Sequence, residues 1–315
     1  MKLQCPVPRI LIPIDGSEHS KQAVQFAGCL GASLGKSLSS ITLLNVTGGS
    51  YLSPLSSIDL RAKVLDKPET LAMIRDTYIQ ENIIPLMEEG EKILRDSGIK
   101  IEIGRLLVDG KPGDEILRVA DKDKVSTIIM SRRGLSELKG FFLGSVTSKV
   151  VHAATRQTLY IVGHSIPEKG ACPVSRILIP VDGSSHSMKG VEHAACLISS
   201  LKASFSKVTL LRVIDLELVA AKLQAGIIPD DEAAKILDKA RELLVQAGLS
   251  EKLITVLRKT GNPAEEILKE AEAGYDLIIM GRKGRTALKD LVLGGVSSTV
   301  LHRTDELTVA IMSSE

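Results

Sequence analysis

Short apolar runs alternate with longer amphipathic stretches along the whole chain. Most of the short runs are apolar at every position, which is typical of parallel strands that are covered by helices on both faces. Amphipathic stretches such as 20–34 and 230–248 predict the helices between them. The alternation predicts an α/β fold in which right-handed βαβ crossovers build doubly wound parallel sheets. The predicted strands are 9–14, 41–46, 101–108, 125–130 and 158–162, then 176–181, 208–213, 253–259, 276–280 and 307–312.

The chain contains the same segment twice. "CPVPRILIPIDGS" at 5–17 returns as "CPVSRILIPVDGS" at 172–184. Between 5–30 and 172–197, 17 of 26 positions are identical. Repeats of solenoid proteins recur every roughly 20–50 residues, so a repeat 167 residues apart indicates a duplicated domain instead.

The repeat predicts the domain organisation. We expect the first domain at 1–165, the second at 172–315, and a linker at 163–171. The offset between the halves falls from 167 residues at the first strand to 150 near the fourth, so the first half carries 17 extra residues, mostly within 47–90. This region predicts a short helix, a turn at Pro68 and a long helix. It is either a lid or partner surface, or a tolerated elaboration of one connection.

Composition and charge exclude several classes of partner. Hydrophobic residues make up 44% and charged residues 25% of the chain, the usual balance of soluble globular proteins. Polyanions bind to clustered cationic side chains, and the bases of single-stranded nucleic acid also stack on aromatic side chains. The net charge is +2 and aromatic residues make up 3%, so we exclude nucleic acid and anionic membranes as partners. No apolar run approaches the ~20 residues of a membrane span, and no signal peptide is evident, so we expect a cytoplasmic protein.

The four cysteines are two positions repeated in both halves: Cys5, Cys29, Cys172 and Cys196. They form no C-x-x-C pair and have no neighbouring histidine at metal-ligand spacing. We therefore expect small buried apolar side chains in a reducing compartment rather than a redox or metal site.

A polar turn follows the first predicted strand of each half, "PIDGSEHS" at 13–20 and "PVDGSSHS" at 180–187. Asp15 and Asp182 end the strand, the next glycine permits a tight turn, and the following serine can cap a helix. Alone, this pattern is as consistent with a structural turn as with a binding site.

A glycine-rich loop follows the fourth predicted strand of each half, "IIMSRRGLSELKGFFLGSVTSKVVH" at 128–152 and "IIMGRKGRTALKDLVLGGVSSTVLH" at 278–302. Each has two small residues three apart, then nine residues, then a small pair that opens a helix. Free N–H groups in such a loop can hold a phosphate chain. The loops also offer hydroxyls and cations, on Ser145, Thr147 and Arg133 in the first half and on Ser297 and Lys283 in the second.

The turn and the loop face one crevice if the first and fourth strands are neighbours. Ligands of open α/β sheets bind beyond the carboxyl ends of the strands, where the winding direction reverses. The P-loop signature is absent, and no nucleophile, base and orienting acid occur together at a recognisable spacing, so efficient phosphoryl transfer is not predicted. His152 and His302, near the end of the next helix, suit the helix dipole better than catalysis.

The pattern G-x-x-G, nine residues, then G-S or G-T, with an aspartate ending the first strand, resembles the universal stress protein family. The resemblance covers essentially the whole chain as two copies. It implies a five-stranded parallel sheet of order 3-2-1-4-5 in each half, and an ATP site with the aspartate beside the adenosine, the end of the second strand against adenine, and the glycine loop around ribose and phosphates. The residues so implied are Asp15, Val46, Met130, Ser131, Arg133, Gly134, Gly144, Ser145, Val146 and Thr147, then Asp182, Val213, Met280, Gly281, Lys283, Gly284, Gly294, Gly295, Val296 and Ser297.

Each half departs from the family pattern at one position. Ser131 stands where the pattern has its first glycine, and its Cβ is expected to crowd a nucleotide. Gly295 stands where the pattern has serine or threonine, so one hydroxyl is lost. One neutral hydrogen bond is worth roughly 0.5–1.5 kcal/mol, about tenfold in affinity at most. We therefore expect two competent sites of unequal affinity.

The resulting hypothesis is a regulatory protein that binds ATP with Mg²⁺ in both halves and hydrolyses little or none of it. The bound nucleotide orders a surface that an unknown protein partner recognises. Two alternatives stay open: a nucleotide-free scaffold, and a slow ATPase or a protein that phosphorylates its own Ser145 or Ser297. The resemblance implies a dimer-like pairing of the two halves, since single-domain relatives usually pair as dimers, and exposed sheet edges tend to be paired. We predict that 158–162 and 307–312 meet across a pseudo-twofold axis; further pairing of whole chains is left open.

Overall fold

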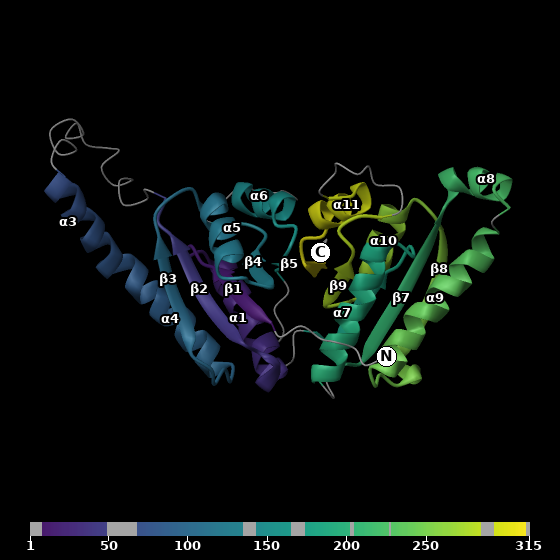
Figure 1. The fold of residues 1–315 in the computed structure, drawn as a ribbon, viewed down its shortest axis with the longest axis horizontal. Helices are drawn as coiled ribbons and strands as arrows, with labels where there is room; N and C mark the ends of the chain where they lie inside the picture. The colour runs from purple at the N-terminus through teal and green to yellow at the C-terminus, as the bar shows by residue number, and fades with distance from the viewer. Residues whose placement is uncertain are drawn as a thin grey trace.

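Ten strands form one sheet that runs through both halves of the molecule (Figure 1). The computed structural model describes residues 8–48, 68–134, 143–164, 174–201, 205–226, 228–284 and 293–312. The strand order is β3-β2-β1-β4-β5-β10-β9-β6-β7-β8, so each half has the predicted order 3-2-1-4-5. Every predicted strand is found, with its ends within two residues of the prediction. The strands are β1 Arg9–Pro13, β2 Ser40–Val46, β3 Ile103–Val108, β4 Thr127–Ser131 and β5 Thr158–Val162, then β6 Arg176–Pro180, β7 Lys207–Asp215, β8 Ile254–Gly261, β9 Leu277–Met280 and β10 Thr308–Ile311.

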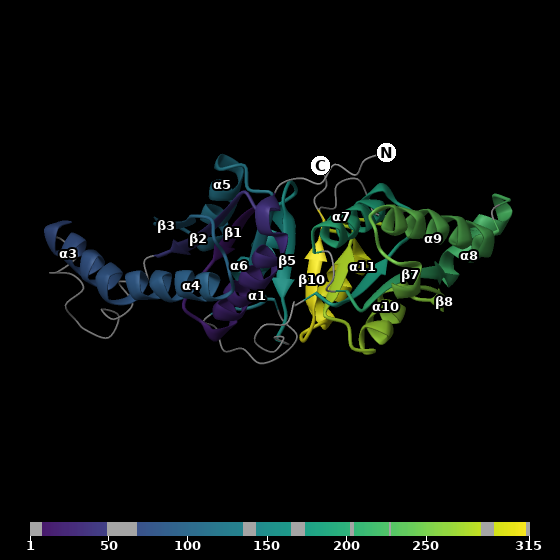
Figure 2. The same ribbon diagram turned by 90° about the horizontal axis from the view of Figure 1, so that it is seen from below.

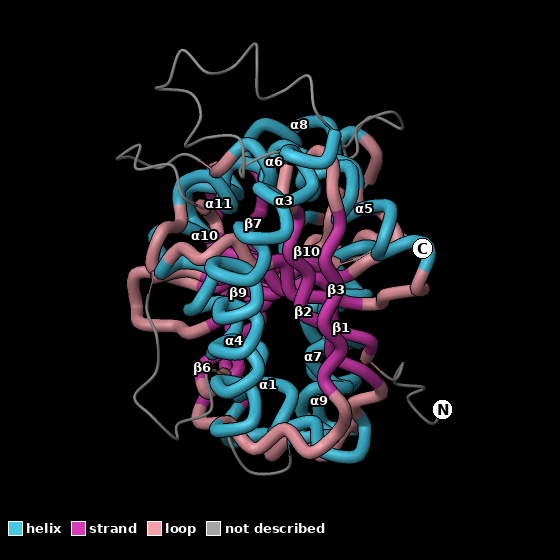
Figure 3. Tube along the Cα trace, turned by 90° about the vertical axis from the view of Figure 1, so that its left-hand side faces the viewer, coloured by secondary structure: helices cyan, strands magenta, loops and turns pink. Residues whose placement is uncertain are grey.

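Helices cover both faces of the sheet (Figure 3). They are α1 Glu18–Leu34, α3 Pro68–Tyr78, α4 Ile84–Asp96, α5 Pro112–Lys122, α6 Ser145–Ala153, α7 Ser185–Leu201, α8 Leu216–Gln224, α9 Pro229–Gln246, α10 Pro263–Ala271 and α11 Gly295–Arg303. One layer holds α1, α4, α7 and α9, and the other holds α5, α6, α10 and α11. Figure 1 shows α3 and α8 at the two outer ends of the molecule. In the described part of the chain, no helix is both long and apolar enough to span a membrane.

The two faces of the sheet bury separate apolar layers, because successive side chains of a strand point to opposite faces. In β1, Ile10 and Ile12 belong to the layer of α1 and α4, whereas Leu11 packs with Ile116 and Val150 in the layer of α5 and α6. With so few aromatic residues, both layers consist mainly of Ile, Leu, Val and Ala. This packing fixes the strand ends that carry the polar turn and the glycine loop.

Residues 68–96 form one nearly continuous helix in the first half. A π-helical turn at Ile79–Ile83 joins α3 to α4, and Pro85 is the second residue of α4. Proline lacks an N–H and its ring clashes with the carbonyl four residues earlier, which accounts for the widened turn. This is the predicted long helix after Pro68. The short helix predicted earlier in 47–90, and most of the predicted linker, lie outside the described residues.

The halves join where β5 pairs with β10 in an antiparallel ladder (Figure 2). Ile161 lies opposite Val309, and Tyr160 lies opposite Ala310. The pairing confirms the predicted meeting of the last strands. The oxygen of the Tyr160 hydroxyl lies 2.6 Å from Nε2 of His193, which is in α7 of the other half. A polar contact therefore crosses the junction inside an otherwise apolar layer.

Stability is expected to fall as the pH falls below about 6.5, the usual pKa of histidine. Burial lowers the pKa of His193 to about 4, so the folded protein holds the ring neutral and the unfolded chain takes up the proton first. The contribution is fully present above pH 6.5 and is lost progressively down to pH 4. His193 is partly exposed, so we expect a loss of about 2 kcal/mol rather than the roughly 3 kcal/mol of the whole shift. Urea unfolding from pH 8 to pH 4 measures it.

The control for this pH dependence is His193→Gln, which keeps a polar side chain but does not titrate. The variant is expected to lose less stability than the parent between pH 6.5 and pH 4. An identical pH profile for both proteins would contradict the assignment to His193.

Cys196 in α7 is disulfide-bonded, whereas Cys29 in α1 is not in a disulfide. The prediction that the cysteines are isolated apolar side chains is therefore wrong for Cys196. A disulfide joins cysteines that are close in space. Spacing along the sequence does not reveal which cysteines the fold brings together.

Candidate functional site

In each half, the polar turn after the first strand lies beside the glycine loop after the fourth strand. β1 pairs with β4, with Ile10 opposite Thr127, and β6 pairs with β9, with Ile177 opposite Leu277. The helices that follow leave toward opposite faces, α1 and α7 into one layer and α6 and α11 into the other. This is the reversal of winding at which open α/β sheets bind ligands.

Asp15 and Asp182 organise the polar turns. Oδ1 of Asp15 accepts hydrogen bonds from the N–H of Ser17 at 3.0 Å and from its hydroxyl at 2.6 Å. Oδ1 of Asp182 accepts from the N–H of Ser184 at 2.9 Å. Ser17 and Ser184 cap α1 and α7 by accepting, at 3.1 Å, from the N–H three residues further on. One carboxylate oxygen therefore fixes the turn.

The other carboxylate oxygen lies against a glycine of the loop in both halves. A Cβ added to Gly284 would lie 2.9 Å from Oδ2 of Asp182, and one added to Gly134 would lie closer still to Oδ2 of Asp15. A side chain at either glycine would displace the carboxylate. These glycines therefore allow the close approach of aspartate and loop backbone that the sequence pattern implied.

A main-chain hydrogen bond closes the base of each glycine loop. The N–H of Gly144 donates to the carbonyl of Arg132, and that of Gly294 donates to the carbonyl of Arg282, both at 2.8 Å. Gly144 and Gly294 are also the N-cap residues of α6 and α11. The first N–H groups of a helix have no partner within the helix and carry its positive dipole end. The crevice therefore receives a set of donors suited to an anion.

The hydroxyls of Thr147 and Ser297 are engaged within the protein. Oγ1 of Thr147 donates to the carbonyl of Ser131 at 2.9 Å, and Oγ of Ser297 donates to the carbonyl of Gly281 at 2.8 Å. Both side chains are buried, and they tie the helix start to the end of the preceding strand. We expected these two hydroxyls to donate to a ligand, but in this arrangement both donate to the protein main chain. Ser145, by contrast, is exposed at the start of α6.

Ser131 does not stand in open ligand space. At the equivalent Gly281, an added Cβ would lie 2.6 to 2.7 Å from the main chain of His186 and Ser187 at the start of α7. Ser131 itself is buried, and its hydroxyl donates to the carbonyl of Arg133 at 2.5 Å. Having serine instead of glycine at position 131 therefore affects how closely the neighbouring helix packs, and does not crowd a ligand in the crevice.

The two candidate cations have different surroundings. Nη2 of Arg133 lies 3.5 Å from Oδ2 of Asp305, which belongs to the second half, and the Arg133 side chain is 14% exposed. Lys283 lines the crevice of its own half. The first cation is therefore held at the junction, and the second faces the space that a ligand would fill.

A pocket of about 220 Å³ lies at the predicted place in the second half. It is formed by the ends of β6, β7 and β9 and the starts of α8, α10 and α11. Eight predicted residues line it: Asp182, Val213, Met280, Gly281, Lys283, Gly284, Val296 and Ser297. Gly294 and Gly295 lie beside it, at the start of α11. In the first half, Asp15, Gly134, Gly144 and Thr147 converge in the same way, with Val46 at the end of β2, Met130 in β4, and Ser145 and Val146 in α6.

Sequence reasoning missed several apolar residues of this pocket. Leu211 precedes Val213 by two positions on β7, so strand alternation was the signal that could have found it. Pro263 and Ile267 belong to α10, whose start was recognised only as a helix start. Leu218 comes from α8, and no motif linked that helix to the site. Together they add apolar surface to the lining of the pocket.

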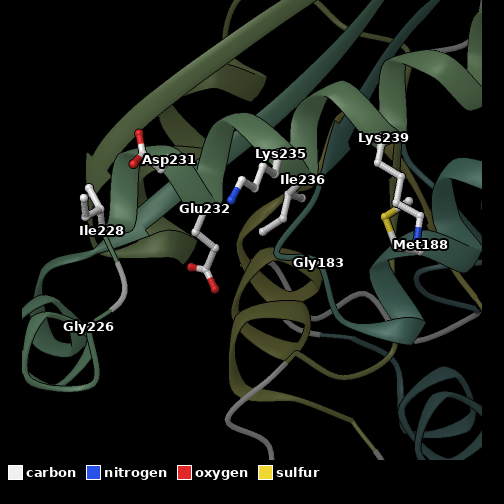
Figure 4. A pocket seen from close by; sticks show the side chains of 9 residues that line it. All are labelled: Gly183, Met188, Gly226, Ile228, Asp231, Glu232, Lys235, Ile236 and Lys239. Atoms are coloured by element: carbon white, nitrogen blue, oxygen red, sulfur yellow. The ribbon is translucent and has the colours of Figure 1, made fainter.

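A larger pocket of about 540 Å³ lies in the other helix layer, between the start of α7 and α9 (Figure 4). Asp231, Glu232, Lys235 and Lys239 of α9 line it together with Met188. Its charges are mixed, and it contains none of the predicted site residues. Gly183 lines this pocket and the preceding Asp182 lines the smaller one, so a single turn separates the two.

Fold and site together define a protein of two fused, doubly wound α/β domains, with a polar, glycine-lined pocket at the switch point of the second half and equivalent residues at that of the first. The model of the universal stress protein family matches residues 6–161 and again 173–309. The chain therefore belongs to the universal stress protein family, as the motif resemblance implied.

Individual relatives agree with this assignment. Universal stress protein YxiE of Bacillus subtilis (strain 168) is 31% identical over 148 residues, which cover 42% of this chain and 93% of the relative. Universal stress protein MJ0531 of Methanocaldococcus jannaschii is 29% identical over 146 residues, 45% of this chain and 84% of the relative. The crystal structure of a universal stress protein from Archaeoglobus fulgidus covers 99% of this chain and 100% of its own, with a TM-score of 0.66 and 21% identity. This likeness extends the shared fold to both domains.

Proposed function

We propose that this protein binds ATP with Mg²⁺ in the crevice of each half and acts as a regulatory binding protein with little or no turnover. One observation carries the proposal. In the second half, apolar strand ends, two aspartates, a glycine backbone, a lysine and an arginine converge on one pocket at the switch point. A nucleotide needs an apolar surface for its base and, beside it, N–H donors and cations that bind its phosphates. The pocket combines the two.

The residues present fit such a ligand. Leu211, Val213 and Ile267 would offer apolar contacts to adenine, and Oδ2 of Asp182 would accept from a ribose hydroxyl. The volume of about 220 Å³ is below the roughly 300–1,000 Å³ of pockets that enclose a whole drug-sized ligand. We therefore assign base and ribose to the pocket, and the phosphates to Gly281–Gly284, Lys283 and the start of α11 at its mouth. Mg²⁺ would be held mainly by the phosphates.

The first half is assigned the same role from its equivalent residues. Asp15 and Gly134 make the same close approach as Asp182 and Gly284. Arg133 is drawn toward Asp305, so we expect the first site to be the weaker one. The domain bounds 1–165 and 172–315 and the cytoplasmic location stay predictions.

The deciding experiment is to denature freshly purified protein and identify any released small molecule by mass spectrometry, with its amount per chain. ATP near two per chain supports two sites, and near one supports the second half alone. If none is released, a melting curve with ATP and Mg²⁺ follows, because a ligand at 100 times its Kd stabilises by about 2.7 kcal/mol. No shift would favour the nucleotide-free scaffold. Steady ADP release would favour the slow ATPase.

Replacing Gly295 by serine is expected to tighten ATP binding in the second half by about three- to tenfold, because a hydroxyl adds one donor at the start of α11. No atom lies within 4 Å of a Cβ added at this position, so the side chain has room. Titration calorimetry measures the change. Gly295→Ala is the control, since it adds the Cβ without the hydroxyl and is expected to leave the affinity unchanged. Equal tightening by both variants would rule out the hydroxyl as the cause.

A further inference from the structure

Two buried arginines cross the junction between the halves in a reciprocal manner. Arg132 is 2% exposed and donates to the carbonyl of Leu301 in the last turn of α11. Arg282 is fully buried and donates from Nη1 to the carbonyl of Val151 at 2.7 Å and from Nη2 to that of Ala154, at the end of α6. Each arginine therefore caps the C-terminal end of a helix that belongs to the other half.

Both arginines are also part of a glycine loop. Arg132 lies between Ser131 and Arg133, and its own carbonyl accepts the bond from Gly144 that closes the first loop. Arg282 lies between Gly281 and Lys283, and its carbonyl accepts the equivalent bond from Gly294.

The helices that the arginines cap begin at the opposite crevices. α6 begins at the first glycine loop and ends at the side chain of Arg282, and α11 begins at the second loop and ends at the side chain of Arg132. Two paths of hydrogen bonds and helix therefore connect the crevices, one through α6 and Arg282 and the other through α11 and Arg132.

These contacts have few alternatives. The last carbonyls of a helix have no partner within the helix, and a cation is favoured there by the helix dipole. Burial lowers the pKa of both guanidinium groups to about 10, so both are charged at neutral pH. A buried cation that loses its acceptors is strongly destabilised, so the arginine and the helix end move together or not at all.

The two paths are not equivalent. Nε of Arg132 lies 3.4 Å from Oδ1 of Asp305, whose Oδ2 also holds Arg133. Among the residues that the structure describes, no carboxylate lies within ion-pair distance of Arg282. Arg282 therefore depends on the carbonyls at the end of α6 more than Arg132 depends on α11.

We propose that Arg132 and Arg282 are positioning residues that couple the two crevices, so that a nucleotide bound in one half raises the affinity of the other. The coupling rests on the proposed ATP binding. A ligand that orders one glycine loop also orders the arginine within it. That arginine fixes the helix whose first turn forms the other site, so the second ligand pays less of the ordering cost.

Native mass spectrometry of the full chain, titrated with ATP and Mg²⁺, tests the coupling because it counts chains with no, one and two nucleotides. The informative ratio is the empty population times the doubly loaded one, divided by the square of the singly loaded one. For independent sites, however unequal, this ratio does not exceed about one quarter. We expect the parent protein to exceed it, and Arg282→Lys, which keeps the charge but not the two-pronged contact, to lower the ratio at least about fivefold. Arg132→Lys is expected to lower it less.

Tyr160→Phe is the matched control, since it removes a polar contact from the same junction without touching either loop. It is expected to lower the melting temperature and leave the ratio unchanged, whereas a merely structural role of the arginines would change stability alone. The coupling is overturned if the parent ratio stays at or below one quarter, or if Tyr160→Phe lowers it as much as Arg282→Lys. Chains that load no nucleotide at all would remove the proposed function and the coupling with it.

Discussion

Replacing Gly163 by alanine is expected to lower the free energy of unfolding by about 3 kcal/mol. Gly163 follows β5 and crosses the segment that leads into β10. A Cβ there would lie 2.5 Å from the carbonyl carbon of Glu306 and 2.6 Å from that of Leu307, and closer still to the Glu306 oxygen. These are main-chain atoms, which cannot rotate away as a side chain can. The antiparallel ladder between β5 and β10 must therefore shift.

Urea unfolding of the nucleotide-free protein measures this effect. Because the ladder joins the halves, we also expect the single transition to broaden or divide into two as the halves lose their coupling. Gly295→Ala is the matched control, because its Cβ meets no atom within 4 Å and alanine favours a helix by up to about 1 kcal/mol over glycine. A Gly163→Ala protein as stable as its parent would contradict the close contact of the two main chains.

The strands could be predicted closely because their apolar runs are continuous and the turns between them are polar. The pairing of β5 with β10 also followed from the sequence, because an unpaired apolar edge is unfavourable. The side chains that cross this junction could not be predicted in the same way. Arg132 and Arg282 stand among loop residues and look like surface cations, yet both are buried. Their burial depends on helix ends contributed by the other half, about 130 to 170 residues away.

The candidate site shows the same division between backbone and side chain. The glycines and aspartates were found because a close approach of main chains leaves a fixed spacing in the sequence. The direction in which each hydroxyl or cationic side chain points is not encoded by any fixed spacing in the sequence. Thr147 bonds to a strand carbonyl and Arg133 turns toward Asp305, although the motif alone suggested that both face a ligand. Leu218 was missed because packing, not a motif, brings α8 to the pocket.

Replacing the N-cap glycine of one loop by valine is expected to weaken nucleotide binding in that half by about a hundredfold, a change of about 2.7 kcal/mol. A Cβ on Gly294 would lie 3.3 Å from Cα of Lys283 and 3.5 Å from the N–H nitrogen of Gly284, so the branched side chain covers the donors of the loop. Gly144 has equally close neighbours, with the carbonyl of Arg132 at 3.3 Å. Valine is also a poor N-cap, which costs about 1 kcal/mol of helix stability.

The two single variants and the double variant separate the halves, because each isolates one crevice in an otherwise intact chain. We expect Gly144→Val and Gly294→Val each to reduce the ATP bound per chain from two to one by titration calorimetry, and the double variant to bind none. Gly294→Val should cause the larger loss of total affinity, since Lys283 faces its own crevice whereas Arg133 is held by Asp305. Gly294→Ser serves as the control for the cap, because serine caps a helix as well as glycine does and its side chain is smaller than that of valine. If Gly294→Val binds two nucleotides as tightly as the parent protein, the phosphates do not lie on this loop. The crevice at the switch point would then hold some other part of the ligand, or none of it.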